Sequence, residues 1–222
     1  MRQPHRSANL GSRRAVFVLF CAALVLAPSP DGTTTAAHAG QQPARQGHEH
    51  QAQTPPPQPR FTRTVASYAP PDVTLVDMNG ARVRFAAALE CEGPILLQFI
   101  FTTCPTICPV MSGTFAATQD RLGAAVGRVR MISVSIDPEQ DTPERLRVYA
   151  RKFKAGPQWL FLTGDLDRIV AVQKAFDAYR GNKMRHEPLT FLRAAPGQPW
   201  VRLDGLMSAT QLVAEYRRLA TQ

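Results

Sequence analysis

The stretch that decides the fold runs Ile95-Leu96-Leu97-Gln98-Phe99-Ile100-Phe101-Thr102-Thr103-Cys104-Pro105-Thr106-Ile107-Cys108-Pro109. Its apolar first half, Ile95 to Phe101, predicts a buried strand, and the residues after it predict a helix. Cys104 and Cys108 therefore lie where the strand gives way to the helix. Because positions i and i+4 share one face of a helix, both sulfurs can face one metal ion or join in a disulfide.

The surrounding pattern predicts an α/β fold. Strands are expected at Val73–Val76, Arg82–Phe85, Val129–Ile136, Trp159–Leu162, Leu189–Arg193 and Trp200–Leu203, and helices at Cys108–Leu122, Pro143–Phe153, Asp165–Tyr179 and Ser208–Leu219. Asn79-Gly80 predicts a turn that makes an N-terminal β-hairpin of the first two strands. Strands alternating with helices, then a closing hairpin and helix, predict a central mixed sheet flanked by helices. A cysteine pair at a strand-to-helix corner of such a sheet favours a thioredoxin-like fold.

Residues 1–39 have the pattern of an export signal. Arg13 and Arg14 precede an apolar stretch, Ala15–Ala27, and the small residues Ala37-His38-Ala39 follow. We expect a signal peptide cleaved after Ala39. The alternative is an uncleaved anchor, although the apolar stretch is shorter than the roughly 20 residues that a spanning helix needs. Either reading places the protein outside the cytoplasm, in the periplasm, free or tethered to the inner membrane.

The remaining chain divides into a linker and one domain. Residues 40–60 are rich in Gln and Pro and predict an extended linker, in which His48-Glu49-His50 is interpreted as part of a solvated tether. Residues 61–222 suffice for one domain with its own core. The chain has a formal charge of +9, which favours an acidic protein partner or an anionic membrane. Nucleic acid is not expected as a partner, because no binding motif is present and the chain carries an export signal.

The cysteine corner predicts a soft metal site. The amino end of a helix stabilises thiolates, and thiolate sulfur favours Cu(I). A third donor is expected from His186, in the loop before the strand Leu189–Arg193, and Met184 is a weaker candidate. The other histidines fall in the signal or the linker: His5, His38, His48 and His50.

Other chemistries also fit the cysteine pair. Cys104 and Cys108 can form a structural disulfide, or act as a thiol–disulfide oxidoreductase in which Cys104 attacks and Cys108 resolves. Two cysteines, a histidine and a water also suit zinc. A peroxidase is disfavoured, because Phe101 and Leu97 stand where peroxiredoxins carry Thr and Pro before the reactive cysteine. Cys91 is interpreted as an incidental thiol in a loop.

In these motifs the chain resembles the Sco, or SenC, family of thioredoxin-like copper proteins, named for the synthesis of cytochrome c oxidase. The resemblance covers about Val73 to Leu219. It is carried by Phe99 to Pro109 as quoted above, by Ser133-Val134-Ser135-Ile136-Asp137-Pro138-Glu139-Gln140-Asp141-Thr142-Pro143, by Leu162-Thr163-Gly164, and by His186 before Leu192. One departure is Glu187, because the family usually has a hydroxyl residue after the histidine.

The resemblance implies a function and a site. Cys104, Cys108 and His186 would bind copper, and the protein would deliver it to the binuclear copper centre of cytochrome c oxidase or reduce the cysteines of that centre. The partner would be the copper-bearing oxidase subunit or another copper chaperone, and the protein would act as a monomer. Asp137 would either orient a donor beside the site or only end its strand.

Overall fold

The computed structural model describes residues 61–220. The predicted signal of residues 1–39, with its cleavage after Ala39, and the predicted linker of residues 40–60, with His48 and His50, lie outside the described residues. The division of the chain into signal, linker and domain therefore stays a prediction. From residue 61 to residue 220, no helix is long and apolar enough to cross a bilayer.

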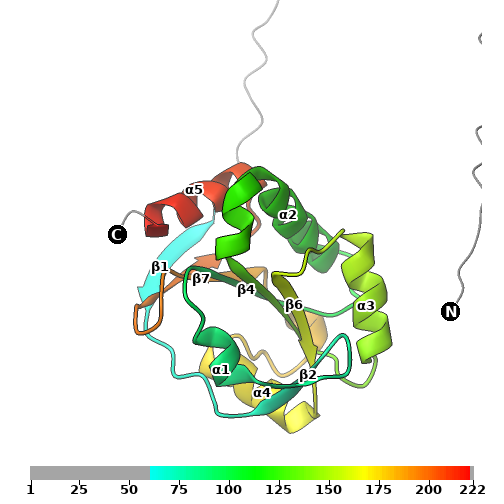
Figure 1. Cartoon of the computed structure of the whole chain (residues 1–222). Coiled ribbons are helices and arrows are strands. Elements are labelled where there is room, and N and C mark those ends of the chain that lie inside the picture. The colour runs from blue at the N-terminus through cyan, green and yellow to red at the C-terminus, as the bar shows by residue number, and fades with distance from the viewer. Residues whose placement is uncertain (1–60, 221–222) are drawn as a thin grey trace, which may run out of the picture. The chain divides into compact units, whose positions relative to one another are not determined.

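The centre of the domain is one mixed sheet of eight strands (Figure 1). The strands are β1 Thr62–Ala66, β2 Thr74–Asp77, β3 Arg82–Arg84, β4 Ile95–Ile100, β5 Arg130–Ser135, β6 Trp159–Thr163, β7 Leu189–Arg193 and β8 Trp200–Asp204. Their order in space is β1-β8-β7-β4-β5-β6-β2-β3. The neighbours β4, β5 and β6 are parallel, and the other pairings are antiparallel. The predicted mixed sheet is confirmed.

Helices cover both faces of this sheet (Figure 1). One face carries α2 Ile107–Leu122, α3 Pro143–Lys152 and α5 Ala209–Ala220, and the other carries α1 Phe85–Leu89 and α4 Leu166–Ala175. Two short 3-10 turns are η1 Gly123–Arg128 and η2 Lys183–Arg185. All six residues of β4 are buried, because a central strand covered on both faces has no side exposed to water.

Helix α3 begins at Pro143, the residue at which the sequence predicts a helix to start. The Thr142 hydroxyl accepts a hydrogen bond from the Arg145 backbone N–H at 3.4 Å, and Pro143 is the first helical residue. A threonine cap satisfies one of the free N–H groups of the first turn, and proline loses no hydrogen bond there. This cap ends the loop that begins at Asp137 and fixes where that loop passes into α3.

The β2–β3 hairpin, strand β1 and helix α4 differ from the expectation. The hairpin of β2 and β3 exists, but β2 also pairs with β6, so the hairpin extends the main sheet. Strand β1 was not expected, because its side chains are almost all exposed and show no apolar alternation; backbone pairing with β8 holds it at the sheet edge.

The helix expected at Asp165–Tyr179 is α4, and it ends at Ala175. Shortly after it, Asp177 adopts a positive φ of 48°, which a helix cannot continue through.

An aromatic cluster fixes the end of α4. The buried ring of Phe176 has its centroid 5.1 to 6.2 Å from those of Tyr68, Phe85, Phe99, Phe191 and Trp200. Such aromatic pairs contribute about 0.5–1.5 kcal/mol each beyond the burial of their area. The cluster therefore anchors the start of the connection from α4 to β7, which carries His186.

Candidate metal centre

Cys104 and Cys108 lie at the carboxyl end of β4, but not on one helical face. Helix α2 begins at Ile107, so Cys108 is in its first turn and Cys104 precedes it. The expectation that the two cysteines share a helical face is wrong, because Pro105 disfavours a helical backbone at Cys104. The Cys104 N–H instead donates to the Phe101 carbonyl at 3.1 Å. Cys108 is fully buried, and Cys104 is 7% exposed.

The Cys104 sulfur lies where it can cap helix α2. The side chain of Thr106, the residue before the helix, makes no capping hydrogen bond. Burial by itself raises the pKa of the Cys104 thiol, but hydrogen bonds from the backbone N–H groups of Cys108 and Thr106, together with those of their side chains, outweigh it and leave this pKa below its ordinary value. Free N–H groups at a helix start favour a thiolate. The predicted stabilisation of a thiolate therefore applies to Cys104.

Cys108 has the opposite tendency. Burial raises its pKa strongly, the charges of Cys104 and Asp141 raise it further, and a hydrogen bond from the Phe101 N–H offsets this only in part. That bond joins the Phe101 nitrogen to the Cys108 sulfur at 3.4 Å. The apo pair is thus a thiolate-prone Cys104 beside a protonated Cys108.

We expect Cys104 to react with iodoacetamide at least about tenfold faster than Cys108 near pH 7. The thiolate is the reactive form, so the lowered pKa of Cys104 speeds its alkylation and the raised pKa of Cys108 slows that of Cys108. Mass spectrometry of peptides from the native chain, sampled over time and pH, measures both rates, and the urea-unfolded chain supplies the reference. Faster labelling of Cys108 than of Cys104 would contradict the arrangement.

His186 completes the cluster from a distant part of the chain. It follows η2, and its Nε2 lies 3.3 Å from the Cys108 sulfur. Its ring meets Phe101 edge-on, with centroids 5.4 Å apart. Burial lowers the pKa of His186, and the nearby charge of Glu187 offsets this in part. A neutral imidazole with a free lone pair is the form that binds metals.

The three predicted donors meet through Cys108. Cys104 and His186 each contact Cys108. No three His, Cys, Asp or Glu side chains among residues 61–220 already surround a single point where an ion could sit. Met184 is 65% exposed, so its side chain points into solvent rather than into the cluster.

The two aspartates of the loop between β5 and α3 have different roles. Asp137 is almost fully buried and pairs with Lys183, with Oδ2 and Nζ 2.6 Å apart. Asp141, which the sequence analysis did not select, accepts hydrogen bonds from the Thr102 N–H, the Thr102 hydroxyl at 2.5 Å and the Ser135 hydroxyl at 2.6 Å. Asp141 thus holds the turn that leads from β4 into Cys104. The local signal for this role of Asp141 is a pair of hydroxyl residues that could bond to a buried carboxylate, Ser135 at the end of β5 and Thr102 two residues after β4.

A cavity of about 360 Å³ opens beside His186. Its wall combines charged groups with apolar side chains from α4: Asp137, Lys183, His186, Leu166 and Val170. His186 is thus reached from solvent through this cavity, while Cys108 stays buried behind it.

Comparison with known sequences finds a family match along most of the chain. A sequence model of the SCO1/SenC family matches residues 64–221. The SCO1 protein homolog of Bacillus subtilis is 44% identical over 70 residues, which make up 31% of this chain and 36% of that protein. The matched stretches span about a third to a half of the length of the first curated relatives.

Solved structures agree with the fold. Arabidopsis thaliana ScoI with copper bound is 26% identical, has a TM-score of 0.60, and is matched over 71% of this chain and 99% of that chain. BsSco, described as having a disulfide switch and as a member of the Sco family of cytochrome c oxidase assembly proteins, is 26% identical with a TM-score of 0.60, over 72% of this chain and 98% of that chain. These similarities confirm the predicted thioredoxin-like fold.

Proposed function

Because the chain belongs to the SCO1/SenC family, we propose that it is a copper metallochaperone that binds copper through Cys104, Cys108 and His186. Its client is the copper-bearing subunit of cytochrome c oxidase, or another copper chaperone that exchanges copper with it. The copper bound to Arabidopsis thaliana ScoI and the oxidase-assembly description of BsSco support this assignment.

The observation that carries the proposal is the contact between the Cys108 sulfur and His186 Nε2 at 3.3 Å. It joins a soft thiol to an imidazole whose burial keeps it neutral. With Cys104 alongside, the donor set of two sulfurs and one nitrogen suits Cu(I). Cys108 must lose its proton to become a ligand, so loading with copper releases a proton from this buried thiol.

Copper titration of the full chain, reduced and free of oxygen, tests the proposal. The wild type is expected to bind one copper per chain, and Cys104→Ser and His186→Ala are each expected to bind it at least about tenfold more weakly, since each removes one donor. Competition with a Cu(I) chelator gives the affinities. Affinity that is unchanged in both variants would refute the three-ligand site.

A second candidate function is thiol–disulfide exchange, which the unequal thiols support. The Cys104 thiolate would attack a disulfide of the partner and release one partner thiolate. Cys108 would then lose its proton and attack the Cys104 sulfur, which frees the reduced partner and leaves a Cys104–Cys108 disulfide. The disulfide switch described for BsSco supports this reading. A Cys108→Ser variant would trap the mixed disulfide, and the reaction would not need His186.

We further propose that the protein acts after export, in the periplasm, either released by cleavage after Ala39 or tethered by residues 1–39. Mass spectrometry of the protein purified from its native membrane and soluble fractions would identify the first residue of the mature chain.

A further inference from the structure

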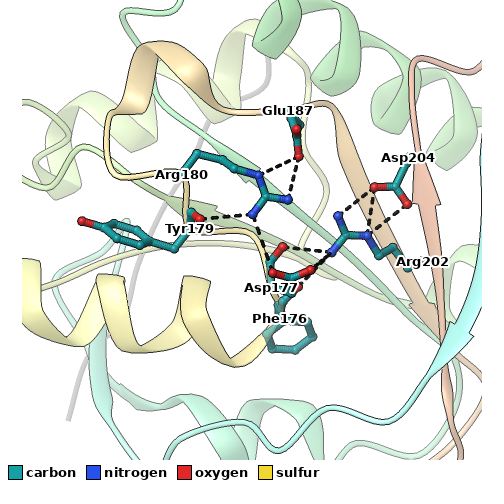
Figure 2. Close-up of polar contacts among 7 residues, drawn as sticks. All are labelled: Phe176, Asp177, Tyr179, Arg180, Glu187, Arg202 and Asp204. Atoms are coloured by element: carbon teal, nitrogen blue, oxygen red, sulfur yellow. Dashed lines mark hydrogen bonds and ion pairs between the residues drawn. The ribbon is translucent and has the colours of Figure 1, made fainter.

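The connection that carries His186, from Asp177 to Pro188, is held mainly by charged side chains (Figure 2). Apart from the short turn η2 it has no helix or strand. At its start, the buried Arg202 of β8 donates to the Asp177 carbonyl at 2.9 Å and to the Phe176 carbonyl at 3.3 Å. Asp204 in turn holds the Arg202 guanidinium, with an oxygen 2.7 Å from Nη2. The start of the connection is thus fastened to the sheet.

A second ion pair closes the connection on itself. Arg180 near its start meets Glu187 near its end, with Nη2 and Nε of the guanidinium 2.7 and 2.9 Å from the same carboxylate oxygen (Figure 2). Arg180 also donates to the Tyr179 carbonyl at 3.1 Å. We call the pair of Arg180 and Glu187 the clasp. Because Glu187 directly follows His186, the clasp restrains the backbone on the carboxyl side of the imidazole.

A third ion pair fixes the middle of the connection. Lys183 of η2 pairs with the buried Asp137 at 2.6 Å and lies over the Phe101 ring, 5.9 Å from its centroid. Phe101 is also the ring that His186 meets edge-on. We call the pair of Lys183 and Asp137 the latch. It ties the segment just before His186 to the loop that follows β5.

We propose that Arg180, Glu187 and Lys183 are positioning residues that hold the His186 imidazole against the Cys108 sulfur before copper arrives. An irregular connection would otherwise sample many conformations, and ordering it during binding would cost affinity. The clasp and the latch restrain the segments on either side of His186 in the apo protein. The inference rests on the proposed copper site, since only a ligand needs its imidazole held in this way.

Glu187→Gln, Arg180→Gln and the double variant, all in the full chain, test the clasp. Each single variant is expected to speed amide hydrogen exchange across residues 180–187 in the apo protein and to weaken copper binding about threefold, the effect of a partly exposed ion pair. Arg180 also pairs with Asp177 at 3.7 Å, so Arg180→Gln is expected to weaken binding at least as much as Glu187→Gln. The double variant is expected to be no weaker than Arg180→Gln, because within residues 61–220 the only ion pair of Glu187 is the clasp that Arg180→Gln already removes. Lys183→Met, which breaks a more buried pair, is expected to weaken binding about tenfold.

Asp72→Asn is the matched control, because it removes another surface ion pair, that of Asp72 with Arg84 at 3.3 Å, from outside the connection. It should leave exchange at residues 180–187 and copper affinity unchanged. The inference is overturned if Glu187→Gln leaves either quantity at the wild-type value, or if the Arg180 and Glu187 effects simply add. A wild type that binds no copper would instead refute the proposed function, and the exchange rates of the apo protein would still report on the clasp.

Discussion

Replacing Cys108 with serine is expected to weaken copper binding more than about a hundredfold. Loss of a partner outside the metal's ligands costs about 10–100-fold, and Cys108 is proposed as a ligand itself. It is also the one sulfur that both other donors contact. Serine keeps the shape of the side chain but offers a hard oxygen that Cu(I) binds poorly. Competition of the reduced full chain with a Cu(I) chelator measures the loss.

Cys91→Ser is the control for this prediction. Cys91 is a free thiol, partly buried beside the core. It lies before β4, whereas Cys104 follows that strand, so Cys91→Ser should leave copper affinity unchanged. Equal losses in Cys91→Ser and Cys108→Ser would mean that copper binds to thiols without regard to the site. Unchanged binding in Cys108→Ser, together with a trapped mixed disulfide, would favour the exchange function.

Replacing Asp141 with alanine is expected to lower the free energy of unfolding by about 3 kcal/mol or more, because buried donors left without an acceptor cost about 1–3 kcal/mol each. Asp141 is fully buried, and its carboxylate accepts from Thr102 and Ser135. The midpoint of thermal unfolding should fall by roughly 10 °C. Chemical and thermal denaturation of the full chain measure both.

Asp120→Ala is the matched control, since Asp120 is an exposed carboxylate on α2 and its loss should change stability by less than about 0.5 kcal/mol. An Asp141→Ala variant as stable as this control would show that the hydrogen bonds from Thr102 and Ser135 to Asp141 do not contribute to stability. Because Thr102 begins the turn into Cys104, the Asp141 variant should also lose the difference in alkylation rate between Cys104 and Cys108.

The contribution of Asp141 to the free energy of unfolding should depend on pH. Burial raises the pKa of Asp141 above its ordinary value, and hydrogen bonds from Ser135 and Thr102 offset this only in part. The contribution of a carboxyl whose pKa is raised by folding is fully present below the unfolded pKa and is lost as pH rises through the folded one. The wild type should therefore lose stability relative to Asp141→Asn as pH rises above about 4. A wild type that gains stability relative to Asp141→Asn as pH rises would contradict the raised pKa of Asp141.

Local signals in the sequence predicted much of the fold. The apolar run from Ile95 predicted the central strand, because a strand buried on both faces needs no polar alternation. Thr142 and Pro143 predicted the start of α3, because helix capping depends only on neighbouring residues. Cys104 and Cys108 were predicted as donors from the chemistry of thiolates, and His186 because it is the only histidine after residue 60. The structure brings Cys108 into contact with both of the others.

What the sequence missed depends on partners far along the chain. Strand β1 is held by backbone pairing with β8, which leaves no pattern in its exposed side chains. The start of α2 agrees with the expectation to within one residue. The shared helical face expected for Cys104 and Cys108 is wrong, because Cys104 precedes the helix and Pro105 disfavours a helical backbone there.

The sequence by itself determined the central strand, the capped start of α3 and the kinds of donor atom, because these follow from hydrophobic periodicity and from the chemistry of single side chains. Only the tertiary structure decided that His186 meets Cys108, that Asp141 lies beneath the turn into Cys104, and that Lys183 reaches Asp137. The physical reason is that such contacts join residues whose separation along the chain leaves no local trace, and that burial, which sets the pKa of each group, exists only once the helices have closed over both faces of the sheet.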